Sequence, residues 1–270
     1  MRLREDLPDE ERIGRRDLTW WPSALGRWLV RLVLRMSRWA SANLVLAILV
    51  AAGAGLVVGL TAASAEIYEA VDEGDGISRW DRPALEGAIG LRTGTNTEVA
   101  TFFTHLGGPL GMTLIAACLT LVMTLAWRSR TPLLLMVIGV AGSLTMTTVG
   151  KQLVGRVRPP VAEAVPPFES SPSFPSGHTL NSTVIAGLVA YLLLRRLSSN
   201  LARAVTVVLA AAWAVAMGLS RVFLGHHWLT DVAVGWTLGL AWVGILVLAH
   251  RLFLTVRRRS AAPAVSSSRS

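Results

Sequence analysis

Long stretches of this sequence contain almost no charge. Only 16% of its 270 residues are Asp, Glu, Lys or Arg, whereas 52% are apolar. The apolar residues fall in blocks of about 20, the length at which a helix crosses a bilayer. This distribution argues against an ordinary soluble core, and it predicts an all-α, polytopic membrane protein.

Cysteine and lysine are nearly absent. Cys118 is the only cysteine, so no intramolecular disulfide and no cysteine-based metal site can form. Lys151 is the only lysine, and the net charge of +9 therefore comes from arginine. The arginines flank the apolar blocks, which membrane topology explains better than nucleic-acid binding. We expect membrane lipids, and no nucleic acid, as partners.

Six apolar blocks predict a bundle of six transmembrane helices. They cover about 44–63, 108–127, 132–150, 179–194, 201–219 and 229–254. Residues 63–65 resemble a signal-peptidase site, but the preceding block is longer than a typical signal core, so we expect a retained helix. The segment 66–107 is expected to be a large loop, acidic in its first half, with a short interfacial helix at about 80–91.

The two ends of the chain differ from this membrane domain, which we place at 41–256. Residues 1–40 are expected to form a cytoplasmic segment in which Arg27, Arg31 and Arg35 recur at four-residue spacing. On a helix over 23–38 they form a basic stripe beside an apolar one, which fits a helix on an anionic membrane surface or a plain basic flank that sets topology. Residues 257–270 are expected to be a disordered cytoplasmic tail.

Arginine placement also predicts the orientation in the membrane. Six spans put both termini on one side, together with the turns at 128–130 and 195–203, and the positive-inside rule makes that side cytoplasmic. The loops 151–177 and 220–230 then lie on the extracytoplasmic face. We expect a protein of the bacterial inner membrane with a role in the cell envelope.

Three polar runs interrupt the apolar sequence, and all three fall on that predicted extracytoplasmic face. In the third run His227 and Asp231 are four residues apart, so at the start of a helix the carboxylate can accept a proton from one imidazole nitrogen and leave the other free to attack. We assign His227 as the nucleophile and treat His226 as a neighbour. Taken alone, such a pair is more often a structural hydrogen bond.

The other two runs supply groups that bind phosphate. Ser176 and Gly177 begin a helix after a proline-rich loop, and free amides at a helix start bind phosphate. His178 can protonate a leaving alkoxide. Lys151, Arg158 and the third run's Arg221 are cations that a phosphate dianion would hold together, although interfacial snorkelling explains each singly.

Together the three runs resemble the signature of the type 2 phosphatidic acid phosphatase (PAP2) superfamily. The matching patterns are Lys-x6-Arg-Pro at 151–159, Pro-Ser-Gly-His at 175–178 and Ser-Arg-x5-His-x3-Asp at 220–231, and no fixed position departs from them. The resemblance implies a phosphatase whose His227 forms a phosphohistidine while Asp231 orients it and His178 protonates the leaving group. It also implies that no metal or other cofactor is used. The residues implied to hold the phosphate are Lys151, Arg158, Ser176, Gly177 and Arg221.

The expected substrate is a lipid phosphate or lipid pyrophosphate. Undecaprenyl pyrophosphate, phosphatidic acid, diacylglycerol pyrophosphate and phosphatidylglycerophosphate all fit the resemblance. A lipid phosphotransferase on the same scaffold and a non-catalytic lipid-phosphate binder or transporter are the alternatives. The vanadate-dependent haloperoxidases share the motif, but six apolar spans argue against that soluble branch.

Overall fold

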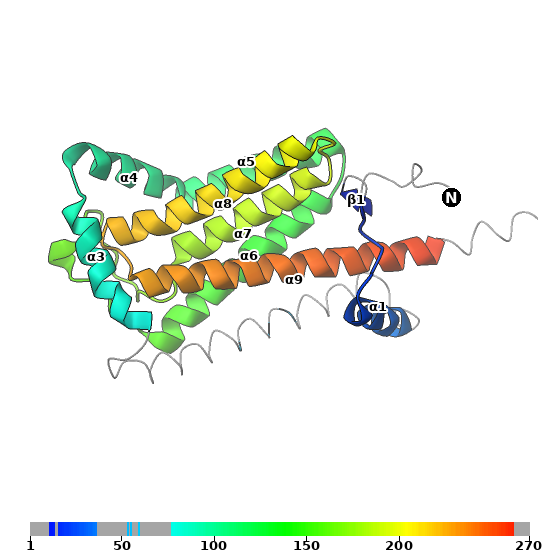
Figure 1. The fold of residues 1–270 in the computed structure, drawn as a ribbon, viewed down its shortest axis with the longest axis horizontal. Helices are drawn as coiled ribbons and strands as arrows, with labels where there is room; N and C mark the ends of the chain where they lie inside the picture. The colour runs from blue at the N-terminus through cyan, green and yellow to red at the C-terminus, as the bar shows by residue number, and fades with distance from the viewer. Residues whose placement is uncertain are drawn as a thin grey trace, which may run out of the picture.

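The computed structural model describes residues 11–13, 16–36, 53, 55, 59 and 77–261. The long apolar helices lie side by side along the molecule, with the helices at 81–90 and 94–106 covering one end and the helix at 24–36 lying across the other (Figure 1). Near the chain start, strands β1 (Arg12–Ile13) and β2 (Arg16–Asp17) pair antiparallel. The helices are α1 (Ala24–Met36), α3 (Asp81–Gly90), α4 (Gly94–Leu106), α5 (Pro109–Trp127), α6 (Thr131–Val154), α7 (Gly177–Leu194), α8 (Asn200–Phe223) and α9 (Leu229–Ala261), with short 3-10 turns η2 (Ile77–Trp80) and η3 (Val161–Glu163).

Helices α5 to α9 confirm five of the predicted spans. Each is long and apolar enough to cross a membrane, and large apolar side chains stay exposed along α5, α6 and α8. In a membrane protein such side chains face lipid rather than water. The remaining predicted span, the first along the chain at 44–63, lies outside the described residues apart from three glycines.

Local sequence signals mark where these helices begin and end. Pro109 and Pro132 lie in the first turns of α5 and α6, where a missing backbone N–H costs nothing. Helix α6 ends at Gly155, which adopts a left-handed φ of +60° that suits glycine. The chain then leaves the bundle and crosses its end as an irregular loop, 155–176.

The predicted loop at 66–107 needs correction in its second half. Helix α3 confirms the helix expected at 80–91, but α4 is a second helix that the sequence analysis missed. The α4 segment is polar and threonine-rich, so it shows no apolar period. Its signal is a capping box in which Thr93 and Asn96 bond each other's backbone N–H groups. Phe103 then packs edge-on against Trp213 of α8, with ring centroids 5.1 Å apart.

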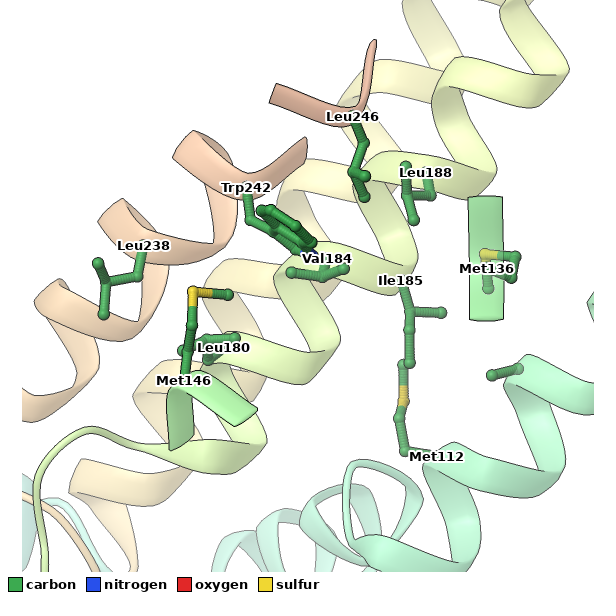
Figure 2. Packing of buried hydrophobic residues seen from close by; sticks show 11 residues of the cluster. Met112, Met136, Met146, Leu180, Val184, Ile185, Leu188, Leu238, Trp242 and Leu246 are labelled. Atoms are coloured by element: carbon green, nitrogen blue, oxygen red, sulfur yellow. The ribbon is translucent and has the colours of Figure 1, made fainter. Parts of the chain in front are cut away.

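The apolar core lies where α7 packs against its four long neighbours. In Figure 2, Trp242 of α9 lies beside Val184 of α7 within a cluster of leucine and methionine side chains. Small residues let the helices approach closely here, as they do in membrane bundles. Trp242 donates to the carbonyl of Gly139 at 3.1 Å, and a Cβ on Gly142 would lie 2.4 Å from the indole. This packing holds the middle of α9 against α6 and α7.

Helix α1 confirms the helix expected over 23–38. Its Val30 and Val33 are buried against Leu252 and Val256 of α9, and its three arginines are exposed. Helix α9 continues to Ala261, beyond the predicted end of the sixth block, so the first residues of the expected tail are helical. The contact of α1 with a membrane surface and the cytoplasmic location of residues 1–40 stay predictions.

Candidate active site

The predicted site residues meet at one end of the bundle, beneath α3 and α4. Lys151 lies in the last turn of α6, Gly177 and His178 begin α7, Arg221 lies near the end of α8, and Asp231 lies in the first turn of α9. A direct backbone hydrogen bond, from the N–H of Ser176 to the carbonyl of Asp231 at 3.2 Å, joins two of the motifs. Segments 80 residues apart in sequence therefore form one site.

His227 and Asp231 form the buried pair that their spacing predicts. His227 is 1% exposed and Asp231 is fully buried, and the imidazole Nδ1 lies 3.4 Å from Asp231 Oδ2. On the other side of the ring, Nε2 lies 3.2 Å from a guanidinium nitrogen of Arg158. A guanidinium only donates, so Nε2 carries the lone pair and Nδ1 carries the proton. The lone pair of Nε2 therefore faces the cation-rich side of the site, where it accepts from Arg158.

The imidazole of His227 is neutral at physiological pH. Burial lowers its pKa to about 4, and the nearby carboxylate of Asp231 opposes this shift without cancelling it. A neutral imidazole is the form that can act as a nucleophile. His226 has a different contact from His227. Its Nε2 bonds to the carbonyl of Val165 at 2.6 Å, which holds the 155–176 loop against the site.

Two arginines and a carboxylate form the charged centre of the site. Arg221 is 1% exposed and donates to Thr104 Oγ1 at 2.8 Å and to one oxygen of Glu169. Arg158 donates to the other oxygen of Glu169 at 2.7 Å. These arginines outweigh the effect of burial and lower the pKa of Glu169 to about 2. A carboxylate thus occupies the fork between two cations that suits a phosphate.

Lys151 and Ser176 were both predicted to hold phosphate, but their side chains are directed differently. Lys151 Nζ bonds to Ser171 Oγ at 3.1 Å and to the carbonyl of Pro172, so the only lysine of the chain points toward the site. Ser176 occupies the N-cap position of α7, but its hydroxyl makes no capping bond and instead accepts from Thr179 Oγ1 at 2.9 Å. The amides at the start of α7, rather than this hydroxyl, are the groups open to a ligand.

A cavity of about 1410 Å³ connects the charged centre to the apolar helices. Its polar end includes Lys151, His178, Arg221 and His227. It then continues between α5 and α6, where the lining residues are mostly apolar, from Pro109 as far as Thr124 of α5. Fifteen helical steps correspond to about 22 Å, most of the thickness of a bilayer core.

Comparison with known proteins agrees with this geometry. The family model described as the PAP2 superfamily matches residues 131–254. Phosphatidylglycerophosphatase B of Bacillus subtilis is 34% identical over 161 residues, which are 59% of this chain and 78% of the relative. The chain belongs to the PAP2 superfamily.

A solved PAP2 structure shares the fold. It is the crystal structure of a transmembrane PAP2-type phosphatidylglycerolphosphate phosphatase from B. subtilis, with a TM-score of 0.61 and 28% identity over 72% of this chain and 92% of that one. The protein is accordingly an integral membrane protein and a phosphatase. Its PAP2 motifs lie where the cavity meets the end of the bundle.

Three charged residues beyond the predicted PAP2 set belong to the site. Glu169 lies between two predicted phosphate-binding arginines, and nothing in its sequence context marked it. Arg156 lies inside the first motif at a variable position, and it donates to Asp231 Oδ1 at 2.5 Å. Asp81 begins α3, far away in sequence, and pairs with Arg156 at 2.7 Å. Of these three residues, only Arg156 had a signal in the sequence. That signal is its position inside the first motif, two residues before Arg158.

Proposed function

We propose that this PAP2 phosphatase hydrolyses a lipid phosphate monoester, and that phosphatidylglycerophosphate is the first substrate to test. The cavity carries this proposal, because it joins a centre of cations and histidines to an apolar channel about as long as a lipid chain. A soluble phosphate ester would have no use for that channel. The B. subtilis relatives, both named for this substrate, support the choice.

In the first chemical step His227 Nε2 attacks phosphorus. The P–O bond to the lipid alcohol breaks as the N–P bond forms, and His178 gives its proton to the departing alkoxide. Lys151, Arg158, Arg221 and the amides at the start of α7 hold the three other phosphate oxygens, whose charge they stabilise in the transition state. Asp231 keeps the proton on Nδ1 and stabilises the positive imidazole that forms.

In the second step water releases the phosphate. His178, now neutral, accepts a proton from a water molecule that attacks phosphorus opposite the imidazole. The N–P bond breaks, inorganic phosphate leaves, and His178 is again protonated for the next turnover. These steps use only side chains of this protein and water.

We place the site on the extracytoplasmic face of the inner membrane. The arginine-rich turns at 128–130 and 195–203 lie at the other end of the bundle, which the positive-inside rule puts in the cytoplasm. Exposed Ser170 and Ser198 give a matched test in a Cys118→Ser background. A membrane-impermeant maleimide on intact spheroplasts should label Ser170→Cys and spare Ser198→Cys. The reverse pattern would contradict the orientation.

The activity is tested with purified protein in detergent and EDTA. Phosphate release is measured on phosphatidylglycerophosphate, phosphatidic acid, diacylglycerol pyrophosphate and undecaprenyl pyrophosphate, and ³²P-labelled protein is analysed for phosphohistidine. We expect wild type to release phosphate and His227→Ala to release none. His250→Gln is the control, because His250 bonds Tyr191 at the opposite end of the bundle.

Three results would contradict parts of the proposal. Folded wild type that releases no phosphate from any of these lipids would refute hydrolysis. Turnover retained by His227→Ala would refute the nucleophile. Label recovered on a second lipid or a sugar, in place of inorganic phosphate, would identify a phosphotransferase.

A further inference from the structure

A buried ionic chain lies behind the His227–Asp231 pair and reaches the start of α3. Arg156 donates from one nitrogen to Asp231 Oδ1 at 2.5 Å and from the other to Asp81 Oδ2 at 2.7 Å. All three side chains of this ionic chain are buried, since Arg156, Asp81 and Asp231 are 7%, 6% and 0% exposed. Thr230 closes a ring, because its N–H and hydroxyl donate to Asp81 at 2.8 and 2.7 Å.

We propose that Asp81 and Arg156 are positioning residues for the proposed nucleophile, acting on His227 through Asp231. This inference rests on the proposed function. Arg156 fixes the rotamer of Asp231, and Asp81 balances the charge of Arg156 so that Asp231 keeps its full effect on the imidazole.

The geometry supports a role beyond holding the fold together. A buried arginine needs a carboxylate partner, and Asp231 alone would satisfy that need. With a single partner, however, the positive charge of Arg156 would cancel the negative charge that orients the imidazole. Two carboxylates around one guanidinium leave a net negative charge next to His227. Arg156 is held as a cation, because the two carboxylates outweigh the effect of burial and raise its pKa.

Charge changes in this chain should therefore shift the titration of His227 in opposite directions. Among the described residues, the other charged or titratable groups around His227 are His226 beside it, Arg158 and Glu169 from the 155–176 loop, Lys151 from α6, His178 from α7 and Arg221 from α8. None of these is altered by the test. Asp81→Asn removes a negative charge, so protonation of His227 becomes harder. Arg156→Gln removes a positive charge, so protonation becomes easier.

The experiment is the pH profile of kcat/KM, whose acidic limb reports protonation of the free enzyme's imidazole. We expect the limb to move to lower pH in Asp81→Asn and to higher pH in Arg156→Gln, and to return toward wild type in the double variant, where the charges balance. In both single variants kcat should fall about 10- to 100-fold, as for outer partners of ligating histidines, with KM unchanged. Glu86→Gln is the control, because it removes the same charge from an exposed ion pair on the same helix.

Limbs that do not move, or that move in the same direction, would overturn the inference and leave a structural role. If Arg156→Gln fails to fold, the comparison of Asp81→Asn with the control Glu86→Gln still tests the proposal. A loss of kcat in Asp81→Asn without a shift of its acidic limb would contradict it. Phosphohistidine trapping on the wild type separates this outcome from failure of the proposed function. A wild type that traps the intermediate while Asp81→Asn behaves like the control refutes the positioning role alone.

Discussion

Replacing Asp231 by asparagine preserves the shape of the side chain and removes its charge. In the native site every neighbour of this carboxylate is a donor. Arg156 donates to Oδ1 at 2.5 Å, while the N–H of Trp228 at 2.9 Å and the hydroxyl of Ser173 donate to Oδ2, which also faces His227. An asparagine has one oxygen and one NH₂ group, so either orientation of the amide directs donors at donors.

The cost to stability is moderate. Removing one partner of a buried ion pair costs about 3–5 kcal/mol when the remaining charge has no other partner. Here Arg156 keeps Asp81 at 2.7 Å, so the loss is closer to that of one unsatisfied donor. We expect the free energy of unfolding to fall by about 1–3 kcal/mol, which leaves the protein folded in the assay.

The cost to activity is much larger. If the new NH₂ group faces His227, Nδ1 must accept its hydrogen bond and the ring proton moves to Nε2. Nε2 then has no lone pair for phosphorus, and it presents a donor to Arg158, 3.2 Å away. In serine proteases the equivalent substitution lowers kcat by about 10⁴-fold through the wrong tautomer. We expect a similar loss here.

Single-turnover formation of phosphohistidine from labelled substrate measures this effect directly. Circular dichroism and thermal unfolding in the same detergent establish the folded fraction. Ser173→Ala is the matched comparison, because it removes one hydrogen bond to Asp231 and keeps the charge, so about a 150-fold loss is its upper limit. A folded Asp231→Asn protein that turns over within tenfold of wild type would refute the assignment of tautomer and nucleophile.

Three further predictions follow from contacts in the site and the core. Arg221→Lys cannot make two separate hydrogen bonds from a planar fork, so kcat/KM should fall roughly 10- to 150-fold, and an unchanged value would make Arg221 a structural cation. Glu169→Gln removes the anion that competes with phosphate, so inhibition by inorganic phosphate should become stronger, and weaker inhibition would contradict this competition. Gly142→Ala puts a methyl group 2.4 Å from the Trp242 ring, so thermal unfolding should show a loss of about 1–3 kcal/mol, whereas Gly244→Ala, which meets no atom within 4 Å, should be neutral.

Much of the fold was predictable because the membrane simplifies the sequence. A span must be apolar over its whole length, so the five blocks from residue 108 onward matched α5 to α9 with differences mainly at their ends. Helix α4 was not predicted because it does not cross the membrane and its sequence shows no apolar period. It is a polar helix that covers the end of the bundle, and its stability comes from a capping box and a contact between Phe103 and Trp213. Neither feature produces an apolar period.

The site separates into a part that local spacing predicts and a part that only the fold creates. His227 and Asp231 meet because they are one helical turn apart, and the motifs identified the cations, of which Lys151 and Arg221 lie at helix ends and Arg158 in the loop that follows α6. Asp81 meets Arg156 across 75 residues of sequence, and Glu169 meets Arg221 across 52. A lone acid in a loop gives no signal of such a partner. The predictable residues are the ones we propose to bind and react, whereas the missed ones balance charge in the structure.

That balance of charge also explains how the site can exist beside the hydrocarbon region. Lys151, Arg158 and Arg221 would be costly so close to lipid without an anion. Glu169 partly meets this need in the free protein and leaves a net charge of two positive units among these four side chains. A phosphate monoester dianion carries the opposite charge, so we expect its binding to neutralise the centre as the substrate takes over contacts that Glu169 makes. We expect the same carboxylate to compete with inorganic phosphate after hydrolysis, which would favour release of the product.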